Sequence, residues 1–330
     1  MLIDMLSASL AKSGALEDAW AKLDSGQDAT VGVASSARPF LVAARFVADP
    51  RATLVVTAGE EAADTFARTV GAFIGEERVL RFPDYEGNPF SVDAPLQPRL
   101  HGRRLEALWS LQQGKPAVVV ASARALLRRI APAKEEVARP LALVAGSDLS
   151  EDPQRGIACF EDLEHCLVAM GYENSGKLDG PGTFCVQGGA IDVFPGNLAY
   201  PVRLDFFGDE LDEIRRFLPS TGQTISSLEQ VDIFPVREFV QTDAALRRAK
   251  RAISKSAETN AAQRDLLERL EDDSRDLPDL MAAYLLEKTA AVGDYLSADA
   301  LTVLIEPRSL VDDAMHAYDE LSKRCVGTSI

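Results

Sequence analysis

Short runs of β-branched residues alternate with amphipathic stretches through the first 140 residues, and this alternation restricts the fold most strongly. The expected strands lie at 30–33 (TVGV), 53–57 (TLVVT), 79–82 and 117–121 (AVVVA). The expected helices lie at 37–49, 59–74 and 99–113. Strands that alternate with helices form a parallel sheet covered by helices. Residues 1–140 are therefore predicted to form an α/β lobe.

The pattern changes near Asp148 and again near Gln241. A helix is expected at 157–170, followed by turn formers and by runs with strand-like alternation, so residues 141–235 predict an inserted α+β domain. Residues 236–330 predict helices, with one buried strand at 300–307 and a last helix at 310–324. We expect this third segment to return to the first sheet, and the chain to be a fragment of a longer protein.

Charge is distributed unevenly along the chain. The formal net charge is −16, and residues 141–235 hold 16 acidic and five basic side chains. Because affinity for duplex DNA comes chiefly from Lys and Arg contacts to phosphates, we expect no autonomous DNA binding. The acidic excess fits either solubility or a basic partner surface, and the sequence leaves both open.

The composition also indicates in which cellular compartment the chain is expected. No apolar run approaches the roughly 20 residues of a membrane span, and no signal-peptide pattern precedes the first apolar stretch, which predicts an amphipathic helix. The cysteines form no CxxC pair, so free thiols in a cytoplasmic protein with no membrane contact are expected. Cys159, His165 and Cys166 share helical spacing, which favours core packing over a metal site.

Several separated motifs between Gly182 and Phe239 keep a consistent spacing. They are a Gly-Thr-Phe turn at 182–184, IDVFP at 191–195, RLDFFGDE at 203–210, IRRF at 214–217, and IFP at 233–235 followed by Glu238-Phe239. Together they resemble the UvrB family and its relatives, the transcription-repair coupling factors (Mfd). Only 14 residues separate Asp84 from Arg99, too few for the aromatic hairpin that UvrB inserts into DNA. The coupling factors are therefore favoured over UvrB itself.

The resemblance implies an architecture and a function. Residues 1–140 would be a degenerate RecA-like (P-loop-like) lobe 1a, residues 141–235 a UvrA-binding domain 2, and residues 236–330 the returning segment 1b. The chain would recruit UvrA without being an enzyme. The parent would be an ATP-driven DNA translocase whose motor uses ATP and Mg²⁺, displaces stalled RNA polymerase and contacts DNA. An intramolecular contact with the parent's C-terminal domain is a further implication. The alternatives are a UvrB-like nucleotide-dependent repair enzyme and a purely structural lobe.

The positions that match the nucleotide site of UvrB have lost its chemistry. In the stretch from Gly32 to Pro39, Ser36 lies in the altered loop, Arg38 takes the place of the P-loop lysine, and Pro39 that of the Mg²⁺-binding hydroxyl residue. Proline offers neither a ligand oxygen nor an N–H. In the second motif, Glu306 and Pro307 stand where UvrB has Asp-Glu. We therefore expect no ATP hydrolysis and no bound cofactor or metal here, although Arg38 leaves room for a stray anion.

The UvrA-contacting positions of UvrB carry over onto five residues. They are Asn174, Cys185, Gln187, Arg203 and Asp205. Arginines would be expected at the first three, so the charge-assisted hydrogen bonds that arginine makes are not available there. Phe194, Phe206 and Phe207 are interpreted as core residues of an antiparallel sheet.

Overall fold

The computed structural model describes residues 8, 14, 16–85, 87–88, 91, 95–150, 157–239, 242–255, 261–271 and 277–328. Two compact units make up the chain. The first contains residues 1–82, 110–123 and 296–313, and the second contains residues 83–109, 124–295 and 314–330. The predicted domain ranges 1–140, 141–235 and 236–330 divide the chain at other points and stay a prediction.

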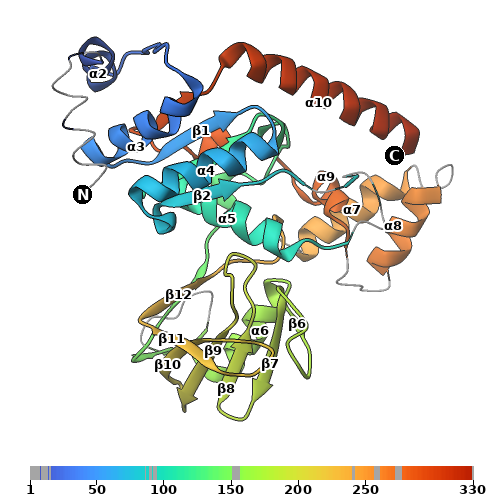
Figure 1. The fold of residues 1–330 in the computed structure, drawn as a ribbon. Coiled ribbons are helices and arrows are strands. Elements are labelled where there is room, and N and C mark those ends of the chain that lie inside the picture. The colour runs from blue at the N-terminus through green and yellow to red at the C-terminus, as the bar shows by residue number, and fades with distance from the viewer. Residues whose placement is uncertain are drawn as a thin grey trace. The chain divides into compact units, whose positions relative to one another are not determined.

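A parallel sheet of four strands forms the first unit. Its strands are β1 (Thr53–Thr57), β2 (Val79–Phe82), β3 (Val118–Ser122) and β13 (Leu301–Leu304), in the order β13-β1-β3-β2. Helices α3 (Arg38–Ala48) and α4 (Glu60–Ile74) cover the face that carries Val55 and Val120 (Figure 1). Strands β1 and β3 are buried on both faces, as is typical of parallel sheets. The predicted α/β class is confirmed.

Two expectations for this unit need correction. Residues 30–33 form no strand, although their composition favours one, because no neighbouring strand pairs with them in the described structure. Strand β13 does pair in parallel with β1, as the predicted return requires. However, β13 is an edge strand, and its Leu304 is 52% exposed rather than buried.

The second unit contains the antiparallel part of the protein. The described strands are β4 (Leu141–Val144), β5 (Ser147–Asp148), β6 (Glu173–Asn174), β7 (Thr183–Gln187), β8 (Ala190–Val193), β9 (Val202–Phe207), β10 (Glu210–Phe217), β11 (Thr224–Leu228) and β12 (Gln230–Ile233). Seven of them form one sheet, in the order β11-β10-β9-β8-β7-β6 with β5 on β10, while β4 and β12 pair separately. Helix α6 (Phe160–Ala169) lies against the larger sheet (Figure 1). Its position agrees with the predicted helix at 157–170.

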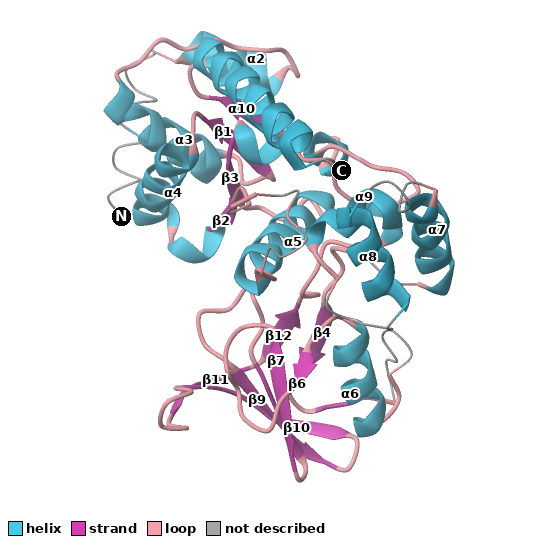
Figure 2. Ribbon diagram, turned by 90° about the vertical axis from the view of Figure 1, so that its right-hand side faces the viewer, coloured by secondary structure: helices cyan, strands magenta, loops and turns pink. Residues whose placement is uncertain are grey.

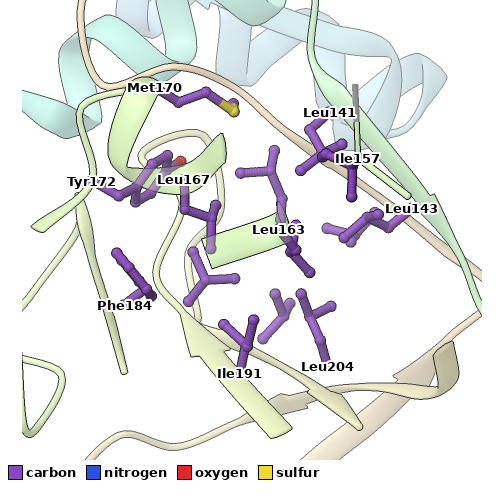
Figure 3. Close-up of a cluster of buried hydrophobic side chains, with 14 of the residues drawn as sticks. Leu141, Leu143, Ile157, Leu163, Leu167, Met170, Tyr172, Phe184, Ile191 and Leu204 are labelled. Carbon is purple, nitrogen blue, oxygen red and sulfur yellow. The ribbon is translucent and has the colours of Figure 1, made fainter. Parts of the chain in front are cut away.

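One apolar cluster holds α6 against this sheet. Leu163 and Leu167 of α6 are fully buried against sheet residues that include Phe184, Ile191 and Leu204 (Figure 3). A fully buried side chain of this size contributes roughly 1.5–3 kcal/mol, so the cluster fixes which face of the sheet is covered. The opposite face is therefore the one left for polar residues.

Helices form the rest of the chain. They are α2 (Glu17–Asp24), α5 (Pro98–Gln112), α7 (Asp243–Ser254), α8 (Ala261–Glu271), α9 (Ala282–Leu285) and α10 (Pro307–Thr328), with short 3-10 turns such as η6 (Asp279–Met281). Figure 2 shows α7, α8 and α9 as one group, and their apolar residues form a core with Phe239. No described helix is both long and apolar enough to cross a membrane. The amphipathic helix expected at the N-terminus lies largely outside the described residues.

Close backbone packing joins α5 to the loop after β8. A Cβ built on Gly196 would lie 1.8 Å from the carbonyl oxygen of Pro98, and one built on Gly102 would lie 2.4 Å from the backbone nitrogen of Asn197. Only glycine permits such an approach. The residues that follow the IDVFP motif therefore pack directly against the backbone of α5.

Candidate docking face and altered nucleotide position

The face of the larger sheet opposite α6, here called the open face, is lined by polar side chains. Directly paired residues on neighbouring strands point to the same side of a sheet. The pairing places one row through Cys185, Asp192, Arg203 and Arg215, and a second row through Gln187, Ala190, Asp205 and Glu213. Four of the five residues predicted to contact UvrA therefore share this face.

Two arginines on the open face are held by carboxylates of the same sheet. Arg203 donates from Nε and Nη2 to the two carboxylate oxygens of Asp192, both at 2.6 Å. Arg215 donates to Asp205 Oδ2 at 3.0 and 2.7 Å, and its Nε lies 3.3 Å from Glu213 Oε2. The hydrogen bond to Asp192 raises the pKa of Arg203. Both arginine side chains are thus held in a fixed direction by carboxylates of the sheet itself.

Phe207 ends strand β9 and lies on the open face, the same face of the strand as Arg203 and Asp205. It is 84% exposed, the highest value among the large apolar side chains of the described residues. The interpretation of Phe207 as a core residue is wrong. Its neighbour Phe206 points to the other face and packs edge-on against Phe160, with ring centroids 5.3 Å apart. Strand alternation explains the difference, because successive side chains point to opposite faces.

Two of the predicted contact residues are placed differently from the rest. Asn174 is paired with Phe184, so it lies on the α6 side, where its Nδ2 donates to Glu164 at 2.9 Å. Cys185 belongs to the open face but is only 4% exposed, and its Sγ lies 3.6 Å from the carbonyl oxygen of Gly176. Gln187, Arg203 and Asp205 remain at the surface. Sequence reasoning missed Phe207, although the alternation in RLDFF places it beside Asp205.

Cys159, Glu161 and Asp209 bring one potential ligand atom each to within 4.8 Å of one another. Asp209 Oδ1 accepts the backbone N–H of Phe160 at 2.9 Å, at the start of α6. A carboxylate at this end of a helix satisfies a free donor and complements the helix dipole. Capping therefore accounts for Asp209, and His165 and Cys166 do not belong to this group.

The altered nucleotide position lies in the first unit. Ser36 belongs to a 3-10 turn (Ser35–Ala37) that leads into α3, where Pro39 lies at the helix start. Arg38 forms an ion pair with Glu306, which follows β13 and has a left-handed φ of 53°. Pro307 is the first residue of α10. The structure thus brings the two altered motifs together, with their side chains bound to each other.

These residues do not fit ATP and Mg²⁺. Phosphate binding at a helix start needs free backbone N–H groups and a basic side chain directed at the ligand. Pro39 lacks the N–H, and Arg38 is paired with Glu306. Gly32 has an ordinary φ and open space around it, so no close approach requires glycine there.

Comparison with known proteins identifies the antiparallel part. Residues 158–239 match the family model described as the UvrB interaction domain. The chain therefore carries a UvrB interaction domain, and the sheet that bears the open face lies mostly within it.

The chain is also similar to proteins named transcription-repair-coupling factor. It is 38% identical over 232 residues to that of Myxococcus xanthus, covering 68% of this chain and 18% of the relative. It is 26% identical over 291 residues to that of Bacillus subtilis, covering 83% of this chain and 24% of the relative. The predicted resemblance is confirmed, and the chain spans about a fifth of the length of these relatives.

Proposed function

We propose that this chain is a UvrA-recruiting module that acts in transcription-coupled repair through the open face of its UvrB interaction domain. The observation that carries the proposal is Phe207, which is 84% exposed on the same face as two arginine–aspartate pairs. Binding energy at protein interfaces concentrates in a few aromatic or arginine side chains surrounded by polar groups. Phe207 provides such an anchor, and Gln187, Arg203 and Asp205 its polar surroundings.

Calorimetry of the chain with UvrA tests the proposal. Phe207→Ala is expected to weaken binding about 30-fold, which corresponds to the loss of about 2 kcal/mol typical of a central aromatic residue. Tyr318→Ala is the matched control, since Tyr318 is an exposed aromatic residue on α10, outside the UvrB interaction domain. No binding heat for the unaltered chain at micromolar concentrations would contradict recruitment. Equal affinity of both variants would contradict only the assignment of Phe207.

Asp205 gives a second, smaller test of the same face. Asp205→Ala removes the acceptor that holds Arg215, so both the charge and the direction of that arginine change. We expect UvrA affinity to fall by less than for Phe207→Ala, since half-exposed ion pairs contribute roughly 0–1 kcal/mol. Binding that is insensitive to this change would remove Asp205 from the site.

We further propose that this chain neither binds nor hydrolyses ATP and holds no cofactor. The Arg38–Glu306 ion pair supports this reading, because it joins the residues that replace the phosphate-binding lysine and a metal-binding acid. The parent's ATP-driven translocation and its contacts with RNA polymerase and DNA would belong to residues outside this chain. The intramolecular contact with the parent's C-terminal domain would be made by this chain itself. A titration with ATP and Mg²⁺ separates this reading from a UvrB-like enzyme. Saturable binding with turnover would favour the enzyme.

A further inference from the structure

The segment that closes the UvrB interaction domain turns inward. After β12, Glu238 is only 7% exposed and accepts hydrogen bonds from Arg104 Nε and Nη2 at 2.5 and 3.4 Å. Arg104, on α5, is fully buried and also donates from Nη1 to the carbonyl oxygen of Pro83 at 2.7 Å. The Glu238-Phe239 end of the motif series therefore has a partner inside the protein and is not offered to a docking protein.

His101 precedes Arg104 by three residues on the same helix, and it is fully buried between two carboxylates. Its Nδ1 lies 3.5 Å from Glu238 Oε1 and 3.4 Å from the Tyr85 hydroxyl. Its Nε2 lies 3.1 Å from Asp279 Oδ2. A neutral imidazole carries a hydrogen on only one nitrogen, whereas a carboxylate only accepts. Carboxylates at both ring nitrogens therefore favour the doubly protonated ring.

The surrounding charges support the same protonation state. Among the described residues, the ionisable groups at the ring are Tyr85, Glu238 and Asp279, and Arg104 and Arg128 lie over the Tyr85 ring. Arg104 is bound to Glu238, while Arg128 lies over the Tyr85 ring at 3.5 Å and donates to the backbone oxygen of Asp279, not to its carboxylate, within the described residues. Burial alone would lower the pKa of His101, but its hydrogen bonds to Asp279 and Glu238 outweigh burial and raise it. A neutral His101 would leave the Asp279 carboxylate buried without a cation bound to it.

We propose that protonated His101 is a clamp that holds the closing segment and η6 against α5, and that loss of its proton loosens η6. Glu238 keeps Arg104 when the ring becomes neutral, whereas Asp279 keeps only a neutral neighbour, so the effect is larger at Asp279. Residues 277–285, which contain η6, include Leu277, Met281 and Leu285 of the helical core. A group whose pKa is raised by folding stabilises fully below its ordinary pKa, about 6.5 for histidine. That stabilisation is lost as pH rises through the folded pKa.

Nuclear magnetic resonance of the intact chain tests the protonation state directly. The chain has three histidines, so their ring-nitrogen signals are separable. His101 is expected to keep two protonated ring nitrogens to a pH above the ordinary imidazole pKa of about 6.5. Asp279→Asn keeps the shape but removes the charge, and it should shift the His101 titration to lower pH. A His101 ring that loses its second proton at or below the ordinary imidazole pKa, about 6.5, in the unaltered chain would overturn the proposal.

Hydrogen exchange tests the conformational consequence. After correction for the intrinsic effect of pH, the amides of residues 279–285 should lose protection by about tenfold as His101 deprotonates, while those of strands β7 and β8 stay protected. His101→Gln should show the reduced protection at every pH, and His316→Gln, which alters an exposed histidine on α10, should behave like the unaltered chain. Unchanged protection through the His101 titration would overturn the clamp even if the ring is charged.

Discussion

Two arginine–glutamate pairs in this protein have the same chemistry and opposite surroundings. In the Arg38–Glu306 pair the side chains are 22% and 57% exposed, whereas in the Arg104–Glu238 pair they are 0% and 8% exposed. Exposed pairs contribute roughly 0–1 kcal/mol, while breaking a buried pair costs about 3–5 kcal/mol. The comparison teaches that the exposed Arg38–Glu306 pair should tolerate substitution, whereas the closing segment is held in place by its buried pair.

The largest effect is expected from breaking the buried pair. Glu238→Ala leaves Arg104 and His101 without their common acceptor, and the free energy of unfolding of the second unit should fall by about 3–5 kcal/mol. Chemical denaturation followed by circular dichroism measures this. Glu306→Ala is the matched control. A loss of equal size in both variants would contradict the comparison.

Lowering the pH should weaken the buried Arg104–Glu238 pair, because acid protonates the Glu238 carboxylate. Burial alone would raise the pKa of this carboxyl, but Arg104 and His101 hold it well below its ordinary value. Its contribution is therefore complete above the ordinary glutamate pKa, about 4.3, and is lost as pH falls toward the folded pKa. The stability difference between the unaltered chain and Glu238→Gln should shrink between about pH 4 and pH 2. A constant difference over that range would count against the buried ion pair.

A further variant tests whether the backbone contact between α5 and the loop after β8 tolerates an added side-chain carbon. Gly196→Ala places a Cβ 1.8 Å from the Pro98 carbonyl oxygen, so α5 or the loop must move. We expect a loss of about 1–3 kcal/mol in the free energy of unfolding. Gly176→Ala is the control, because Gly176 has an ordinary φ and nothing within 4 Å of the new Cβ. Equal stabilities of the two variants would show that the junction relaxes freely.

The smallest effect is expected at the exposed pair. Arg38→Ala should change the free energy of unfolding by less than about 1 kcal/mol, because solvent screens the pair it removes. Thermal unfolding of the variant beside Arg104→Ala measures the contrast. A loss at Arg38 as large as that at Arg104 would mean that the altered nucleotide position is structural.

The sequence correctly predicted the strands and helices that depend on the local spacing of apolar residues. The buried runs at 53–57 and 118–121 and the helix at 60–74 satisfy their hydrogen bonds and bury their apolar residues in the way the spacing requires. The run at 30–33 has the composition of a strand but finds no strand beside it. Strand propensity is realised only when a neighbour supplies the hydrogen bonds.

Residues of the candidate site were predicted less well, because their roles depend on distant partners. Phe206 and Phe207 are identical in type, and only the register of β9 decides which one is exposed. Cys185 is buried although it was predicted to be a contact residue. Arg104 and Glu238 are 134 residues apart in the sequence, and no local pattern connects them.

The arginine pairs of the open face have a kinetic consequence. Immobilising a long side chain during association costs roughly 0.5–1.5 kcal/mol, and Arg203 and Arg215 are already held by Asp192 and Asp205. A partner that docks on this face, as proposed, would meet a surface whose polar groups need little rearrangement. Association should then proceed in one kinetic phase, and differences between related partners should appear mainly in how long each complex lasts.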